Sequence, residues 1–146
     1  MSERTSPAAL RPQVAVASLG RSNIASLVAA LSRLGADVQA TDSAERIRTA
    51  RFAVLPGVGA FGPVSDLLTA SGMDAAFAER VRAGKPTLGI CLGMHLFFEG
   101  SSESPGASGM GIIPGSLGRF EGVCVPQFGW NRVSAGGPIT GPGMWA

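Results

Sequence analysis

The chain has 146 residues, 45% of them hydrophobic, and this length and composition suit a single domain with a substantial apolar core. Its formal net charge is only +2, and acidic and basic residues are interspersed, so no basic patch argues for nucleic-acid binding. No stretch approaches the roughly 18 uninterrupted apolar residues that a membrane helix requires, which argues against a membrane protein.

The N-terminal part of the chain predicts a strand and then a helix. Residues 1–12 are polar and lack the apolar segment of a signal peptide, so we expect a flexible N-terminal arm. Val14–Ala17 is a short apolar run that predicts a buried strand. The apolar residues between Ile24 and Leu34 recur at the spacing of one helix face, and Ser22 or Asn23 is a candidate cap for its start.

Two strands are predicted after this helix, for which Gly35 is the expected C-cap. Residues 37–40 predict a weak strand. Residues 52–55 predict a stronger one, which Pro56-Gly57 is expected to stop.

The middle of the chain predicts a second helix, a strand and a short third helix. The apolar spacing from Met73 to Val81 indicates a helix that ends at Gly84. Residues 87–90 predict a strand, and residues 92–99 predict a short helix that is apolar almost all round and therefore buried. From Ser101 onward glycine is frequent, and the chain predicts turns and short strands.

Strands that alternate with helices predict an α/β domain around a parallel central sheet with right-handed crossovers. Ligands of such sheets bind beyond the carboxyl ends of the strands. Two loops with unusual glycine content, residues 56–62 and 89–93, leave predicted strands at that edge. The candidate site is therefore expected between these two loops.

Residues 89–93, Gly-Ile-Cys-Leu-Gly, combine the end of a strand, a G-x-C-x-G turn and the start of a helix. A sharp turn of this kind lifts its central side chain clear of the sheet, and flanking glycines relieve crowding. The turn presents Cys91 as a candidate nucleophile, and the backbone amide of Leu92 is placed to donate to an oxyanion. A buried cysteine on an ordinary βα turn is the alternative interpretation.

Residues 55–62, Leu-Pro-Gly-Val-Gly-Ala-Phe-Gly, form the second candidate element. A glycine loop at a strand end turns a backbone amide toward a developing negative charge at little steric cost. Taken alone, this loop fits a plain turn equally well.

Together the two loops resemble a known family. Pro56-Gly-Val-Gly59 and Gly89-Ile-Cys-Leu-Gly-Met94 are similar to the HisH-type glutaminase subunits of imidazole glycerol phosphate synthase, which are class I glutamine amidotransferases. The resemblance runs from about Val14 to Val133, in the expected order, and includes Leu96-Phe-Phe-Glu99, Gly109-Met-Gly-Ile-Ile-Pro-Gly115 and Val125-Pro-Gln-Phe-Gly-Trp-Asn131. It implies a flavodoxin-like three-layer domain over residues 13–146, which we expect to be incomplete at its C-terminal end.

The resemblance also implies roles for individual residues. Cys91 would attack the side-chain amide of glutamine and form a thioester, with release of ammonia. The backbone amides of Leu92 and Gly59 would form the oxyanion hole. The residues expected beside the bound glutamine are Gly57, Val58 and His95.

A partner is implied as well, because such subunits form a heterodimer with a HisF-type cyclase, a (β/α)₈ barrel that uses the ammonia in histidine biosynthesis. The positions that match its interface are Asn23, Trp130 and Asn131. No cofactor or metal is implied, since Cys91, Cys124 and His95 do not make a ligand set. The two cysteines make no disulfide framework, so the expected location is cytoplasmic, where thiols stay reduced.

The sequence departs from the family pattern in its catalytic triad. The triad histidine and glutamate of the family lie in a His-Pro-Glu-like segment after the Gly-Trp-Asn motif, and the 146 residues contain no such segment. The one histidine, His95, stands where glutamine is usual and one helical turn after Cys91, a poor position for a general base. Ser18 and Gln127 likewise replace an acidic residue and a histidine that are usual in the family.

Three hypotheses follow. The first is a glutaminase, with this chain alone inactive or weak because the triad histidine and glutamate are absent. The second is a non-catalytic module, derived from the same family, that binds the cyclase or another partner. The intact segment 89–94 favours the first over the second. The third is a different thiol enzyme, which would need another base, such as Glu99 or Glu103, near Cys91.

Overall fold

The computed structural model describes residues 11–19, 24–122, 129, 130 and 132. Its centre is a parallel sheet in which the strands lie in the order β2-β1-β3-β4. The strands are β1 Gln13–Ala17, β2 Asp37–Thr41, β3 Phe52–Gly57 and β4 Thr87–Cys91. Parallel neighbours need crossover connections, and these place helices on the faces of the sheet. The prediction of an α/β domain with a parallel central sheet is confirmed.

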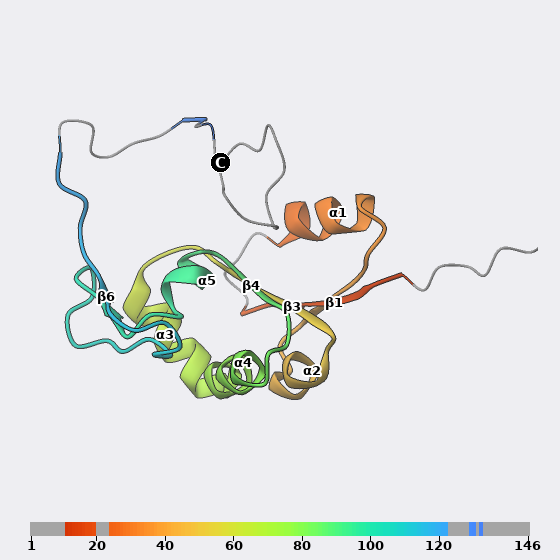
Figure 1. Cartoon of the computed structure of the whole chain (residues 1–146), viewed down its shortest axis with the longest axis horizontal. Helices are drawn as coiled ribbons and strands as arrows, with labels where there is room; N and C mark the ends of the chain where they lie inside the picture. Colours follow the sequence, from red (N-terminus) through yellow and green to blue (C-terminus); the bar gives the residue numbers. More distant parts are fainter. Residues whose placement is uncertain (1–10, 20–23, 123–128, 131, 133–146) are drawn as a thin grey trace, which may run out of the picture.

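Helices cover both faces of this sheet (Figure 1). On one face lies α1, Ala25–Arg33, and on the other lie α2 Ala44–Thr49, α3 Phe61–Ser71 and α4 Met73–Arg82. The short helix α5, Leu92–His95, follows β4 directly, and a small sheet of β5 Gly100–Ser101 and β6 Ser116–Leu117 lies near α3. None of the helices in the described ranges is long and apolar enough to cross a membrane.

Alternate side chains of the central strands face opposite layers, because successive side chains of a strand point to opposite sides. Ala15 and Leu55 belong to the larger core, which the sheet forms with α2, α3, α4 and α5. Val16 and Val54 belong to the smaller core beneath α1. The two cores fix the sheet between its helical layers and leave the carboxyl ends of the strands free to form a site.

The end of α1 confirms the expected role of Gly35. This residue has a φ of +88°, and the amide of Ala36 donates to the carbonyl of Leu31 at 3.1 Å. That bond from beyond the helix to its last turn is the Schellman arrangement, in which glycine takes the left-handed position. The expected caps at the other end, Ser22 and Asn23, lie outside the described residues.

Two helices, α2 and α3, are absent from the sequence-based prediction. In α2 a single residue, Ile47, is buried, so no periodicity marks the helix; its signal is Ser43, whose hydroxyl accepts from the Arg46 amide at 3.3 Å. In α3, Gly62 and Pro63 suggest a turn, although the apolar residues that follow are spaced as on one face of a helix. Proline is tolerated there because an amide in the first turn of a helix needs no partner within the helix.

The boundaries of two predicted elements are wrong. The strand expected to stop before Pro56-Gly57 continues through both residues, which pair with Ile90 and Cys91 of β4. The missing amide of proline is tolerated because the pairing of β3 with β1 has already ended at Val54. The helix predicted over residues 92–99 is a single turn, α5, after which the chain turns away toward β5.

A buried arginine ties the opposite, N-terminal edge of the sheet together. Arg80 of α4 is only 1% exposed, and no ion pair joins it to a carboxylate in the described residues. Its guanidinium instead donates to the carbonyls of Ile47, Ala50, Arg51 and Pro86 and to the Thr87 hydroxyl. Burial lowers the pKa of Arg80, as expected for a cation removed from water. The side chain links α4 to the turns that enter β3 and β4.

We predict that Arg80→Met destabilises the fold by about 2–4 kcal/mol, because the carbonyls that Arg80 satisfies lose their donor in a buried site. Arg82→Met is the matched control, since Arg82 lies on the same helix with its side chain exposed. Urea unfolding of the two variants measures the difference. Equal midpoints would contradict the structural role given to Arg80.

Candidate active site

Cys91 lies at the junction of β4 and α5 in an unusual backbone conformation. Its φ of 54° and ψ of −123° make it the one residue other than glycine with a positive φ in the described part of the chain. Such a conformation costs a residue with a Cβ about 1–3 kcal/mol and persists only where surrounding structure enforces it. The side chain is exposed at the carboxyl edge of the sheet. This is the geometry of a nucleophile elbow, as the sequence predicts.

Close backbone packing enforces this conformation. A Cβ on Gly93 would lie 1.9 Å from the carbonyl oxygen of Leu55 in β3, and one on Gly57 would lie 2.6 Å from the amide nitrogen of Gly93. A Cβ on Gly89 would come within 2.7 Å of the Cα of Met94. No side chain fits at any of these three positions without displacing backbone. The glycines of the elbow therefore let α5 lie directly on β3 and β4.

The second predicted element, the glycine loop, starts beside Cys91. Gly57 is paired with Cys91 across the β3–β4 ladder, so Val58 and Gly59 emerge next to the elbow. Gly59 has a φ of +108°, a conformation that favours glycine, and Val58 is 51% exposed. The loop is shorter than expected: it comprises residues 58–60, which we call the oxyanion loop. Gly62, expected within the loop, is a buried residue of α3.

The remaining candidate site residues near Cys91 differ in burial and in position. Leu92 is buried and begins α5 directly after Cys91. His95 is half-buried and ends the same helical turn. Among the described residues no side chain, including those of Glu99 and Glu103, forms a hydrogen bond with the Cys91 thiol. The structure thus places an exposed cysteine at a sharp turn beside a glycine loop, and no described side chain is hydrogen-bonded to its thiol.

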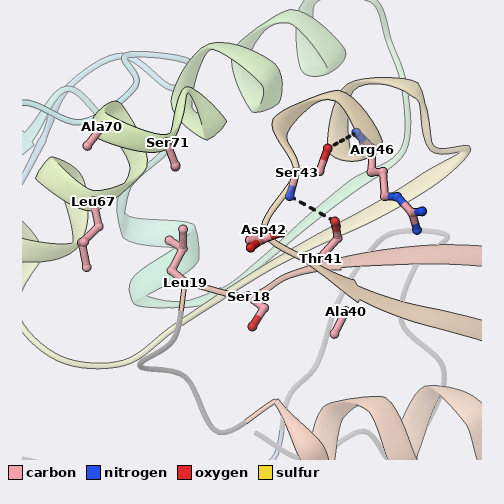
Figure 2. Close-up of a pocket in the computed structure, with 10 residues that line it drawn as sticks. All are labelled: Ser18, Leu19, Ala40, Thr41, Asp42, Ser43, Arg46, Leu67, Ala70 and Ser71. Atoms are coloured by element: carbon pink, nitrogen blue, oxygen red, sulfur yellow. Dashed lines mark hydrogen bonds between the residues drawn. The ribbon is translucent and has the colours of Figure 1, made fainter.

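A cavity lies elsewhere on the same sheet edge. It has a volume of about 930 Å³ and opens at the ends of β1 and β2, between α2 and α3 (Figure 2). Two hydrogen bonds join residues that line it: the Ser43 amide donates to the Thr41 hydroxyl at 3.1 Å, and the Arg46 amide donates to the Ser43 hydroxyl. Ser18 lines it, but none of the residues predicted to bind glutamine does. The cavity is therefore not part of the candidate site.

Sequence reasoning missed Ser104, which touches the start of α3. Its hydroxyl accepts a hydrogen bond from the Gly62 amide at 3.0 Å, across 42 residues of sequence. Ser65, one turn further along α3, donates through its hydroxyl to the carbonyl of Ser108. The available sequence signal is the turn Ser104-Pro-Gly106, which predicts a bend but not its target.

The residues predicted to contact a partner are only partly described. Trp130 is 85% exposed. Asn23, Asn131, Cys124 and Gln127 lie outside the described residues, so their predicted roles stay predictions. No group of three or more potential metal ligands occurs in the part of the chain that the structure describes.

Comparison with known proteins agrees with the fold. The family described as glutamine amidotransferase class-I matches residues 15–115. The chain is 39% identical to the imidazole glycerol phosphate synthase subunit HisH of Deinococcus radiodurans over 136 residues, which are 91% of this chain and 63% of that protein. It is 40% identical to a HisH subunit of Thermus thermophilus, covering 90% of this chain and 68% of that protein.

A longer relative and a solved structure extend the comparison. The chain is 39% identical to the hisHF protein of Arabidopsis thaliana, with 80% of this chain covering 20% of that protein. A crystal structure of a glutamine amidotransferase superposes with a TM-score of 0.62 at 22% identity, covering 73% of this chain and 56% of that one, which shows a shared fold. The chain spans about three fifths of the length of the first HisH relatives it matches.

The strain at Cys91 predicts an inverted order of stability for two variants that both lack the thiol. At ordinary positions glycine is less stable than alanine by about 0.4–1 kcal/mol. At position 91 we expect Cys91→Gly to be more stable than Cys91→Ala by about 1 kcal/mol, because glycine adopts the positive φ without strain.

Urea unfolding of both variants measures this order. Ala29, exposed in the middle of α1, is the control, since Ala29→Gly should lower stability there in the usual direction. A Cys91→Ala variant more stable than Cys91→Gly by the ordinary margin of about 0.4–1 kcal/mol would show that the elbow is unstrained.

Proposed function

Since the chain belongs to the class I glutamine amidotransferase family, and within it to the HisH group, we propose that it is the glutaminase subunit of an imidazole glycerol phosphate synthase. The observation that carries the proposal is the strained, exposed Cys91 beside a positive-φ glycine loop. A fold that maintains strain at a cysteine gains nothing in stability from it, so a role for the thiol in chemistry explains the geometry best.

The proposed reaction starts with the Cys91 thiolate. It attacks the side-chain carbonyl carbon of glutamine and forms a C–S bond, while the carbonyl oxygen takes up the electron pair of the broken π bond. As the tetrahedral intermediate collapses, the C–N bond breaks and ammonia leaves with an added proton. Water then cleaves the glutamyl thioester, giving glutamate and the free thiol.

The oxyanion of this intermediate requires hydrogen-bond donors that are fixed before the reaction. We assign this role to the backbone amides of Leu92, directly after the nucleophile, and of Gly59 in the neighbouring oxyanion loop. The pairing of Gly57 with Cys91 supports this assignment, because it brings the start of the loop beside the elbow. Gly57, Val58 and His95 complete the proposed glutamine site.

A general base is the missing component of the 146 residues. Their one histidine, His95, shares a single helical turn with Cys91, and no described side chain bonds to the thiol. A base and a proton donor for ammonia must come from His95, the partner or residues beyond these 146. General acid–base help contributes about 10²–10⁴-fold, so the 146-residue polypeptide should be a weak or inactive glutaminase by itself.

The same absence of a base is the observation that favours a non-catalytic binding module. Such a module would, however, have no use for a strained elbow, and a residue that relaxes position 91 would be favoured there. The retained elbow therefore makes the glutaminase the better proposal.

For the partner, we propose a HisF-type cyclase barrel that receives the ammonia. The hisHF relative carries both names in one protein, which supports a close association of two such units. Trp130 is a large aromatic side chain left 85% exposed, as residues that anchor an interface are in the free protein. Asn23 and Asn131 belong to the same proposal, and the reduced state that a nucleophilic thiol needs supports a cytoplasmic location.

The proposal predicts a contrast between two substrates of the 146-residue polypeptide. A γ-aryl ester of glutamate should acylate Cys91, because the aryloxide leaves without a proton. Glutamine should release no more glutamate than with the Cys91→Ser control, because ammonia does need one. Spectroscopic detection of the phenol and a glutamate assay measure the two reactions, with the cyclase barrel and its nucleotide substrate present.

The outcomes of this experiment test the nucleophile and the source of the general base separately. Ester consumption equal to that of Cys91→Ser would overturn the proposed nucleophile. Release of glutamate from glutamine that depends on Cys91 would leave the nucleophile in place, but would show that His95 or the partner supplies the base.

The proposed interface predicts that Trp130→Ala weakens binding to the cyclase barrel by at least tenfold, as expected for an aromatic anchor. Phe120→Ala is the control, since Phe120 is equally exposed but lies outside the predicted interface. Titration calorimetry with the purified barrel compares both variants. If they bind alike, Trp130 is not an interface residue.

A further inference from the structure

Helix α3 lacks a cap of its own. Its N-cap residue is Ala60, which offers no side-chain oxygen, and the third helical position is Pro63, which has no amide hydrogen. The amide of Gly62, at the second position, is the donor that a cap side chain would normally bind. The Ser104 hydroxyl accepts this donor at 3.0 Å, so the cap of α3 is supplied from a distant segment.

The contact between α3 and Ser104 is close. A Cβ on Gly62 would lie 3.3 Å from the Ser104 oxygen and 3.6 Å from the Cβ of Ala107. The bond from the Ser65 hydroxyl to the Ser108 carbonyl adds a second tie on the next turn. The segment 104–108 therefore fixes the first two turns of α3.

This fixed helix start is one of two anchors of the oxyanion loop. The other is Gly57, which is buried against the backbone of Leu92 and Gly93. Between the anchors lie Val58, Gly59 and Ala60, all exposed. A connection of three residues allows its two ends little independent movement, since each residue spans at most about 3.3–3.6 Å. A shift of the helix start is therefore transmitted to the peptide of Gly59.

The segment that carries Ser104 is itself bonded to the chain that follows the elbow. The Met110 amide donates to the Leu96 carbonyl and the Ile112 amide to the Phe97 carbonyl, both at 2.8 Å. The Gly109 amide donates to the Glu99 carbonyl at 2.8 Å. A continuous set of backbone bonds thus connects the end of α5 to the segment that holds α3.

We propose that Ser104 is a positioning residue for catalysis. Its hydroxyl fixes the position of the start of α3 and thereby the position of the Gly59 amide relative to Cys91. The inference rests on the proposed glutaminase function, in which that amide stabilises the oxyanion. Ser104 does not touch the reacting atoms. Its loss should slow acylation while substrate binding and the reactivity of the thiol itself are retained.

The test uses acylation of the 146-residue chain by the γ-aryl ester of glutamate. Ser104→Ala should lower the maximal acylation rate constant about tenfold or more, since a misplaced oxyanion donor forfeits part of the roughly 10²–10³-fold that such a donor provides. The half-saturating ester concentration and the rate of alkylation of Cys91 by iodoacetamide, which forms no oxyanion, should stay unchanged. Ser104→Thr keeps the hydroxyl and should restore the rate.

Ser102→Ala is the matched control, because Ser102 is an exposed serine two residues before Ser104 whose described bond is made by its backbone amide. Ser104→Ala acylating at the rate of Ser102→Ala would overturn the inference alone. An equal loss of iodoacetamide alkylation would also overturn it, because the effect would then be structural. If wild type and Cys91→Ser consume the ester alike, the proposed function falls and the inference with it.

Discussion

The direct contact between the backbone of α5 and the strands β3 and β4 is the constraint on which the candidate site depends. It exists only because Gly57, Gly89 and Gly93 carry no side chain where the backbones meet. The contact forces a sharp turn between strand and helix, and the residue at the turn takes a positive φ although it is a cysteine. The same contact holds the start of the oxyanion loop beside the thiol, since Gly57 both packs on Gly93 and pairs with Cys91.

The elements that could be predicted from the sequence are those marked by short, local sequence patterns. The parallel sheet, α1 and α4 were predictable because apolar periodicity and glycine caps mark them, and the elbow was predictable because its glycines flank the cysteine. Helix α3 was missed because Gly62 and Pro63 suggest a turn, although packing against Ser104 favours glycine and the first helical turn accepts proline. The helix after Cys91 was overestimated, because Leu96 and Phe97 fill the core without being helical.

Contacts between distant segments were beyond sequence reasoning. Nothing near Ser104 indicates that its hydroxyl caps a helix 42 residues earlier. Arg80 appears in the sequence as a cation near a helix end, yet it is buried and bonded to carbonyls from two separate turns. The two residues act at opposite edges of the sheet: Arg80 ties the N-terminal edge together, while Ser104 fixes the elements around the elbow. On the proposals made above, stability and catalytic geometry are supported by different tertiary contacts.

The central claim, that the strained elbow makes Cys91 the nucleophile, is tested most directly by locating the glutamyl group after acylation. The chain is treated with the γ-aryl ester of glutamate, quenched in acid, digested and mapped by mass spectrometry. Cys124 serves as the internal comparison, because it is the only other thiol in the sequence. The account predicts a glutamyl thioester on the peptide that contains Cys91 and none on the peptide that contains Cys124. Equal labelling of both cysteines, or labelling of Cys124 alone, would contradict it.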